Sequence, residues 1–271
     1  MALGLEWQLI LELLLLGCVT GFLAGLLGVG GGMMMVPFIT LLLTAKDFPP
    51  EHVIKMAVAT SLATICFTSI ASVRAQHARG AVRWDIFRLL TPGIVVGSML
   101  GAQLAKWLPA ATLALLFAAF VGFSATQMLR DIKPKPTRQL PGTPGMLAAG
   151  AVIGLLAALV GAGGAFVSVP FMVASNVAIH TAVGTSAALG FPIALAGTIG
   201  YVIAGWSLTG MPAGTLGFLY LPALLVVSLA SVAMAPVGVR TAHRLNVRHL
   251  RRMFALLLYG LAGYMLMKGL G

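Results

Sequence analysis

The sequence is poor in charge, above all in negative charge. Only 8% of the 271 residues are charged, with 6 Asp or Glu against 17 Lys or Arg, whereas 59% are hydrophobic. A soluble domain carries about 25% charged residues, so this chain cannot cover a surface that faces water. The scarcity excludes a soluble globule, a disordered chain and, despite the net charge of +11, a nucleic-acid-binding protein. A protein that crosses the membrane several times remains.

Cysteines and catalytic motifs are also scarce. Cys18 and Cys66 lie in apolar runs and form no C-x-x-C motif. We interpret both as small buried residues, while a membrane thiol-redox carrier stays an alternative. No hydrolase or metalloprotease motif occurs, and the five histidines are scattered. We therefore expect neither an enzyme nor a bound metal or cofactor; His180, at the start of a span, is a candidate protonatable group or simply an interfacial polar residue.

Long apolar runs replace the missing charge. They are continuous and rich in Leu and Ala, which indicates α-helices and not the alternating strands of a β-barrel. A straight helix through the run Leu9–Leu43 would be about 52 Å long, against about 30 Å of hydrocarbon in a bilayer. The glycine-rich sequence Gly28-Val29-Gly30-Gly31-Gly32 interrupts this run, where helix propensity is lowest. We predict one full span and a shorter segment, Met33–Leu43, which either crosses the membrane or re-enters it.

The run from Met146 to Ile179 repeats this pattern, with its interruption at Gly161-Ala162-Gly163-Gly164. A basic, proline-rich segment between the two patterns is typical of a linker. We therefore predict a first transmembrane repeat over residues 1–131, a cytoplasmic linker over 132–145 and a second repeat over 146–271. The remaining spans are expected at His52–Val73, Leu89–Leu108, Ala110–Leu129, Thr181–Ala204, Leu216–Gly238 and Met253–Met267.

The two halves share motifs in the same order. Gly21–Phe38 aligns with Gly154–Phe171, 133 positions later, through its glycines and a common Val-Pro-Phe. The triplet Ala59-Thr60-Ser61 aligns with Gly184-Thr185-Ser186, 125 positions later, and we ascribe the eight-residue difference to a longer loop at Ala45–His52. The shared order favours duplication over the chance similarity of two apolar runs. Near the ends of the two halves, Phe117 aligns with Phe254 and Met128 with Met265, in each case 137 positions later.

Positive charge indicates the orientation of the two halves. Cytoplasmic loops carry an excess of Lys and Arg, so we place the three basic loops inside the cell. With five membrane segments in each half, this places the N-terminus outside and inverts one half relative to the other. The loops contain Arg74, Arg79, Arg83 and Arg88; Arg130, Lys133, Lys135 and Arg138; and Arg240, Arg244, Arg248, Arg251 and Arg252. Lys46, Lys55, Lys106 and Lys268 fall on the other side.

The glycine breaks are candidate binding sites. Transporters often combine inverted repeats with discontinuous helices, and the N–H groups that begin the second piece of a broken helix attract anions. We therefore predict a substrate site at the membrane midplane, although close helix packing and hydroxyl bonds within one helix are the simpler explanations for each motif. The predicted site residues are Gly30, Gly31, Gly32, Thr60, Ser61, Gly163, Gly164, Thr185 and Ser186.

The scarcity of carboxylates indicates the sign of the ligand. No Asp or Glu lies deep in a predicted span, whereas an intramembrane cation site usually contains carboxylates. Amides and hydroxyls can bind an anion, and the inside-negative membrane potential favours its export. A neutral solute or a metal ion remains an alternative substrate, and a non-transporting membrane subunit an alternative role.

The doubled glycine motif, followed in each half by a Thr-Ser span, resembles the sulfite exporter TauE/SafE family over essentially the whole chain. The resemblance implies a permease of the bacterial inner membrane for small sulfur-containing anions such as sulfite or sulfoacetate. The second copy departs from the fuller glycine pattern, with Ala158 and Ala165 where the first has Gly25 and Gly32. We thus expect an all-α polytopic membrane protein of two inverted repeats of about five segments each. Its expected partners are the lipid bilayer and a small anion, without nucleic acid; a homo-oligomer stays open.

Overall fold

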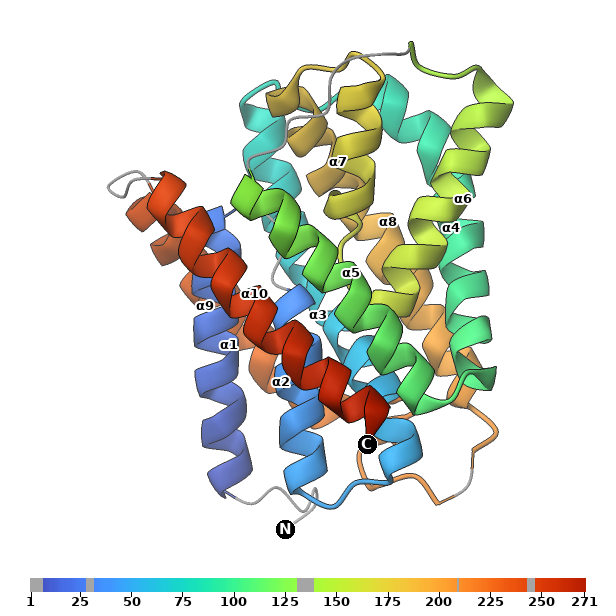
Figure 1. Ribbon diagram of the computed structural model, residues 1–271, viewed down its shortest axis with the longest axis vertical. Coiled ribbons are helices and arrows are strands. Elements are labelled where there is room, and N and C mark those ends of the chain that lie inside the picture. Colours follow the sequence, from blue (N-terminus) through green and yellow to red (C-terminus); the bar gives the residue numbers. More distant parts are fainter. Residues whose placement is uncertain (1–6, 28–31, 131–138, 209, 243–246) are drawn as a thin grey trace.

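The chain folds into a bundle of helices that run along one axis (Figure 1). The computed structural model describes residues 7–27, 32–130, 139–208, 210–242 and 247–271. Within these ranges it contains ten α-helices and one two-stranded antiparallel sheet, which confirms the predicted all-α class. The elements are α1 Trp7–Leu27, α2 Gly32–Ala45, α3 Pro50–Ala78, α4 Trp84–Trp107, α5 Ala110–Arg130, α6 Thr143–Val160, α7 Ala165–Ala174, α8 Ile179–Gly205, β1 Thr215–Leu216, β2 Leu219–Tyr220, α9 Leu221–Ala242 and α10 Val247–Leu270.

Two helices are too short to cross a membrane. Eight helices of the described chain are long and apolar enough to span one, whereas α2 and α7 are not. At 1.5 Å per residue, α2 is about 21 Å long and α7 about 15 Å, against about 30 Å of hydrocarbon. In Figure 1, α2 returns to the lower end of the view, where α1 begins, and α7 returns to the upper end, where α6 begins. The short helices α2 and α7 therefore run toward opposite ends of the bundle.

The third helix of each half, α3 or α8, lies at the centre of the bundle. In the most apolar windows of α3 and α8, 61% of the residues are buried, compared with 28% in α10 and 33% in α1. Large apolar side chains on the outer helices are exposed, among them Leu229 and Met253 at 73% and 70%. Such a surface is suited to lipid and not to water. The protein is therefore a multi-pass membrane protein.

Glycine brings two pairs of helices into backbone contact. A methyl group added to Gly21 in α1 would overlap the backbone of Ser231 in α9, and one added to Gly154 in α6 would overlap the carbonyl of Ile94 in α4. Small residues allow this close approach of membrane helices. The first glycine of each repeated motif is thus a packing residue. One turn earlier on the same helices, a methyl group on Gly17 would crowd the backbone carbonyl of Val227, and one on Gly150 would crowd that of Leu90.

The predicted spans need two corrections. The span predicted at Leu216–Gly238 begins only at Leu221, because residues 215–220 form the β1–β2 hairpin, with Gly217 at a φ of 58° in its turn. The longer loop predicted at Ala45–His52 is also wrong, since four residues link α2 to α3 and four link α7 to α8. The eight extra residues instead lengthen α2 and the part of α3 that precedes Thr60. They add about one helical turn to each.

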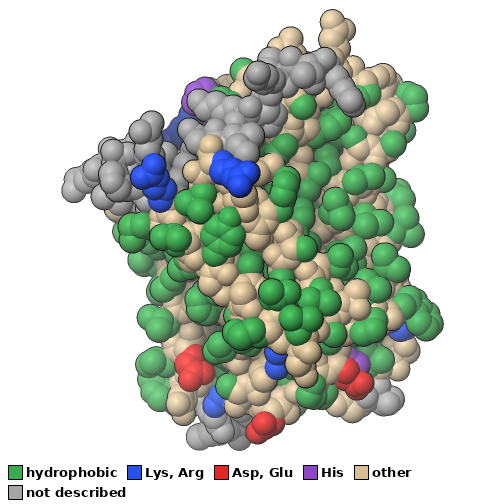
Figure 2. Space-filling model, viewed as in Figure 1, with side chains coloured by type: hydrophobic (Ala, Val, Ile, Leu, Met, Phe, Trp, Pro, Cys, Tyr) green, Lys and Arg blue, Asp and Glu red, His purple; other side chains and the backbone are tan. Residues whose placement is uncertain are grey.

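Charged side chains divide between the two ends of the bundle. The described arginines lie where α3, α5 and α9 end and where α4 and α10 begin, which we call the arginine end. The lysines lie at the opposite end, the lysine end, together with Glu12, Asp47 and Glu51. In Figure 2 the visible acidic side chains gather at this lower end. The arginines whose side chains are described are Arg74, Arg79, Arg83, Arg88, Arg130, Arg240 and Arg252, and the lysines are Lys46, Lys55, Lys106 and Lys268.

Candidate functional site

The first glycine break is described only at its end. Gly30 and Gly31 lie outside the described residues, and Gly32 is the first residue of α2. A methyl group on Gly32 would lie 2.7 Å from the carbonyl oxygen of Gly161, in the second break. The first residue of α2 and the second break, which are remote in sequence, therefore meet in the folded protein.

The second break starts with a left-handed glycine. Gly161 has a φ of 70°, a conformation that glycine adopts without steric cost. Its N–H and that of Ala162 both donate to the carbonyl oxygen of Ala157, which ends α6. A methyl group on Gly161 would crowd Val36 and Val58, so close packing also requires glycine here.

The start of α7 presents unpaired backbone donors. Gly164, with a φ of 74°, is the N-cap residue, and its carbonyl accepts the N–H groups of Val167 and Ser168 at 3.1 and 2.9 Å. The N–H groups of Ala165 and Phe166 have no acceptor among the described residues. Orphan donors of this kind, at the positive end of a helix dipole, attract anions.

Gly163 is the most accessible residue of the second break. It is half-buried, and a methyl group added to it would meet only Ile65, at 3.9 Å. Neither its backbone conformation nor its packing demands glycine, in contrast to Gly161 and Gly164. The space beside Gly163 is therefore the part of the break that a ligand can approach.

Ser61 joins the two breaks. Its hydroxyl lies on α3, is fully buried and donates to the carbonyl oxygens of Gly161, at 3.0 Å, and of Gly32, at 3.3 Å. The proton of this hydroxyl is therefore occupied by backbone carbonyls. For Ser61 to donate to a ligand, these bonds would have to be exchanged.

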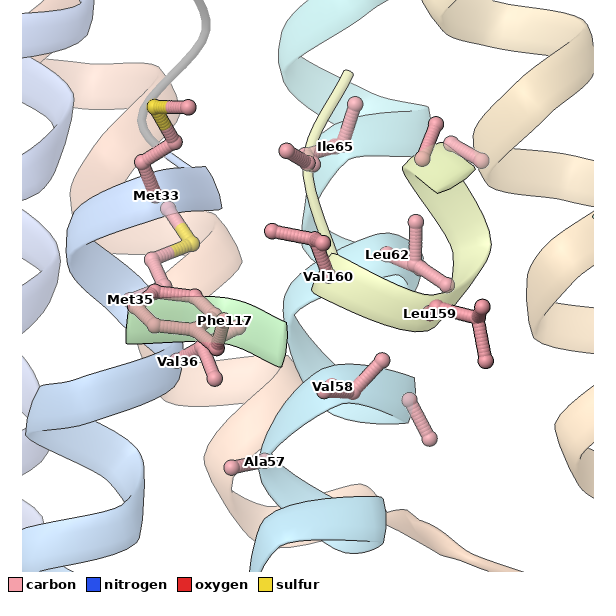
Figure 3. Close-up of a cluster of buried hydrophobic side chains, with 14 of the residues drawn as sticks. Met33, Met35, Val36, Ala57, Val58, Leu62, Ile65, Phe117, Leu159 and Val160 are labelled. Atoms are coloured by element: carbon pink, nitrogen blue, oxygen red, sulfur yellow. The ribbon is translucent and has the colours of Figure 1, made fainter. Parts of the chain in front are cut away.

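Apolar side chains fill the space around this junction (Figure 3). The labelled side chains come from four helices and are buried, so the described surroundings of Ser61 are largely apolar. A polar ligand at this level could be held only by backbone groups and the few hydroxyls. The labelled side chains are Met33, Met35 and Val36 of α2, Ala57, Val58, Leu62 and Ile65 of α3, Phe117 of α5, and Leu159 and Val160 of α6.

Thr60 and Thr185 each accept a backbone hydrogen bond from the other half. The N–H of Tyr220, just before α9, donates to Thr60 at 3.2 Å, and the N–H of Arg83, just before α4, donates to Thr185 at 2.9 Å. A hydroxyl can also donate one hydrogen bond, and neither threonine has an acceptor for it among the described residues. Both are fully buried.

Ser186 pairs with Ser168, which is not among the predicted site residues. Its hydroxyl lies 2.7 Å from that of Ser168 in α7, and both side chains are buried. One of the two protons is used in this bond, so the pair retains one O–H donor. Ser168 is the single polar residue of the apolar helix α7, and that isolation could have identified it.

The predicted site residues do not form one cluster. Gly32, Ser61 and the second break are in contact, and Ser186 joins α7 through Ser168. Thr60 instead bonds toward the lysine end, where α9 begins, and Thr185 toward the arginine end, where α4 begins. The hydroxyls are therefore spread along the bundle axis, on both sides of the glycine breaks, and do not surround one point.

The other candidates lie elsewhere. Cys18 and Cys66 are free thiols, and His180 is exposed at the start of α8. No group of His, Cys, Asp or Glu in the described part of the chain could hold a metal ion. A hollow of about 290 Å³ between α6 and α7 has only apolar lining residues, so it offers an anion no side-chain donor. These residues are Ala148, Ala149, Val152, Ile153, Val167 and Phe171.

Comparison with known proteins finds relatives that are named as membrane transporters. A probable membrane transporter protein of Haemophilus influenzae is 34% identical over 260 residues, covering 96% of this chain and 98% of the relative. A probable membrane transporter protein of Methanocaldococcus jannaschii is 26% identical over 97% of both chains. A third, from Bacillus subtilis, is 31% identical over 73% of this chain and 79% of the relative. The class is thus that of membrane transporters.

The family follows from a match over nearly the whole length. The family described as sulfite exporter TauE/SafE matches residues 13–265. The chain belongs to the TauE/SafE family, which confirms the resemblance seen in the doubled glycine motif.

Proposed function

We propose that the protein exports small sulfur-containing anions, such as sulfite or organosulfonates like sulfoacetate, by alternating access. One observation carries the proposal: the buried polar groups include several free hydrogen-bond donors but no carboxylate among the described residues. Such an interior repels no anion and offers a cation little. The family description supports a sulfur oxyanion. The inside-negative potential adds about 2.3 kcal/mol per charge per 100 mV in favour of export.

The proposed binding groups are the two glycine breaks and the hydroxyls beside them. Gly163 and Gly164 would present backbone N–H groups at the start of α7, as Gly30, Gly31 and Gly32 would before α2. Thr60 and Thr185 would donate their free O–H groups. The serines would contribute by exchanging partners, Ser61 from the carbonyl of Gly161 and Ser186 from Ser168. Hydrogen bonds to a charged ligand are about twice as strong as neutral ones, which favours this exchange.

We also propose that the halves are inverted repeats and that the arginine end faces the cytoplasm of the bacterial inner membrane. Each half makes the same helix contact with the opposite half, and this reciprocity supports the inversion. Gly21 of the first half packs on Ser231 of the second, and Gly154 of the second packs on Ile94 of the first. The positive-inside rule supports the orientation. The linker and the N-terminus would then lie inside and outside the cell, respectively.

Flux through reconstituted vesicles tests the proposal. Purified protein in proteoliposomes should carry radiolabelled sulfite and sulfoacetate faster than protein-free vesicles of the same lipid composition. An inside-negative potential in vesicles loaded with the anion should accelerate its efflux. Equal rates with and without the protein, for both compounds, would refute the proposed function.

Gly163→Ala tests the location of the binding site. The added methyl group has room in the protein, since only Ile65 lies near it, so folding should be preserved. The same methyl group would occupy the space beside the backbone donors and should reduce the apparent affinity for the anion. Gly122→Ala is the matched control, because a methyl group there meets nothing within 4 Å. Unchanged flux in Gly163→Ala would remove this glycine from the site.

A further inference from the structure

Lys55 in α3 is the single charged side chain that is buried among the residues that the structure describes. It is 7% exposed. Its Nζ atom donates to the carbonyl oxygen of Lys106 at 2.9 Å and lies 5.8 Å from the centre of the Phe218 ring. The sequence alone assigns Lys55 to the less basic side of the membrane and gives it no other role. Its burial is a result of the tertiary structure.

The positive charge of Lys55 has no carboxylate in direct contact in the described structure. Its ammonium group forms no salt bridge with any described residue. Glu51, one turn earlier, is 78% exposed at its side chain, and its Oε1 lies 3.3 Å from Nε2 of His52. The carbonyl of Lys106, at the negative end of the α4 dipole, accepts one hydrogen bond. An ammonium group has three N–H donors. Two of them therefore remain free for a ligand, and one carbonyl dipole offsets only part of the positive charge.

A buried cation without a salt-bridge partner is costly, and intramembrane charges are commonly kept for function. We propose that Lys55 binds the transported anion at the lysine end of its path, an inference that rests on the proposed anion transport. The ligand is a small oxyanion of the sulfite or sulfonate type. The oxygens of the anion would accept hydrogen bonds from the two free N–H groups of the ammonium group, and the anion would supply a negative charge in direct contact with it.

The β1–β2 hairpin covers Lys55 in this structure. Phe218, in the turn of the hairpin, lies over the ammonium group and packs edge to face against Tyr201 and His52, with ring centres 6.2 and 5.7 Å away. The N–H of Tyr220 ties the same hairpin to Thr60. Displacement of the hairpin would release the face of Lys55 that Phe218 occupies. The anion would then pass from the Thr60 hydroxyl to Lys55 and out of the protein.

The experiment compares Lys55→Met with Lys106→Met in the proteoliposome assay. Both changes remove one lysine charge at the same end, and Lys106→Met keeps the backbone carbonyl that caps Lys55. We expect Lys55→Met to raise the KM for sulfite and sulfoacetate about tenfold or more, the effect of losing a charge-assisted hydrogen bond. Lys106→Met should stay near the wild-type value. A merely structural Lys55 would change the amount of folded protein and not the KM.

The outcomes separate the inference from the function on which it rests. If wild-type vesicles transport the anion and the two variants share one KM, Lys55 does not bind it, while the proposed function stands. If wild-type vesicles transport neither compound, the proposed function fails. Binding to Lys55 is then decided on the wild-type protein by the chemical protection experiment that follows.

Chemical protection also applies if Lys55→Met does not fold. Acetic anhydride modifies lysines of the detergent-solubilised wild-type protein, and mass spectrometry measures the rate at Lys55 with Lys106 as the internal reference. Methanesulfonate should slow acetylation of Lys55 and leave Lys106 unchanged. Equal protection by sodium chloride at the same ionic strength, or none by either salt, would overturn a sulfonate-type site at Lys55.

Discussion

The two halves of the molecule use the same contacts but differ where their central helices begin. Thr60 of α3 accepts a hydrogen bond from the residue before α9, and Thr185 of α8 accepts one from the residue before α4, the equivalent helix of the opposite half. Five residues before each threonine stands a basic residue, Lys55 or His180. Lys55 is buried, whereas His180 is exposed. Equivalent positions in the repeat therefore have opposite accessibility at the two ends of the bundle.

The difference has two structural causes. The α3 helix begins at Pro50, about one turn earlier relative to its threonine than α8, which begins at Ile179 beside His180. The covering residues also differ in size. Phe218, two residues before Tyr220, lies over Lys55, while Ala81, two residues before Arg83, packs on Gly184. The lysine end is thus closed by an aromatic residue at the position where the described part of the arginine end has the small residue Ala81.

Replacing the two covering residues should show this asymmetry most strongly. Phe218 is 1% exposed, so Phe218→Ala should lower the free energy of unfolding by about 3–5 kcal/mol, the usual cost of such a cavity. Ala81→Gly should cost about 1 kcal/mol or less, since little packing is lost. Thermal melting in detergent measures both. Equal destabilisation by the two changes would contradict the asymmetry.

The glycine seams should instead behave alike in the two halves. Gly21→Ala and Gly154→Ala each place a methyl group against the backbone of the partner helix, and overpacking of this kind costs about 1–3 kcal/mol. Gly122→Ala and Gly260→Ala are the matched controls, because a methyl group at either meets nothing within 4 Å. They should raise stability by up to about 1 kcal/mol through helix propensity. A loss at only one of the two seams would break the equivalence.

The crossed threonine bonds should also be equivalent, each at its own end. Valine at position 60 or 185 leaves a backbone N–H without its acceptor, at a cost of about 1–3 kcal/mol. Hydrogen–deuterium exchange should rise in residues 215–220 for Thr60→Val and in residues 79–83 for Thr185→Val. Thr60→Ser and Thr185→Ser keep the acceptor oxygen and should leave exchange unchanged. A rise at the same end for both valine variants would refute crossed bonding.

The smallest effect is expected at the exposed ion pair of the arginine end. The Arg83 guanidinium pairs with the Asp85 carboxylate through two of its nitrogens, and both side chains are about half exposed. Arg83→Gln should cost roughly 0.2–1 kcal/mol, because exposed ion pairs contribute little. The backbone N–H that serves Thr185 is retained. A larger loss of unfolding free energy, measured by the same melting experiment, would mean that the Arg83–Asp85 pair helps to close the arginine end. The asymmetry with the lysine end would then be smaller than the packing of Ala81 indicates.

Much of the helix pattern could be predicted because each run of apolar residues is a local property of the chain. The break at Gly161–Gly164 was predicted where the structure has it, and the α5 bounds differ from the prediction by one residue. The β1–β2 hairpin was missed, because its apolar sequence is continuous with the span that follows. The extra turns of α2 and α3 were predicted as a loop. Alignment shows that eight residues are inserted between the two matched motifs, but it does not show whether they lie in the loop or in the helices on either side.

The candidate site could be predicted only in part, because side-chain partners come from distant elements. Thr60 and Ser61 are adjacent in sequence and equally buried, yet Thr60 bonds to Tyr220 and Ser61 to Gly161. No periodicity in the sequence separates these two environments. Ser168 was missed for the same reason, since its partner Ser186 lies on the next helix.

The sequence by itself determined the solvent of this protein and the order of its helices. So few charges in so apolar a chain require lipid around it. Each glycine run interrupts an apolar stretch that is too long for a single membrane span. Tertiary structure alone decided which groups became accessible. Lys55 lost contact with water because the hairpin of the opposite half folds over it, and that contact depends on the packing of α3 against α8 and β2 and not on any neighbouring residue in the sequence.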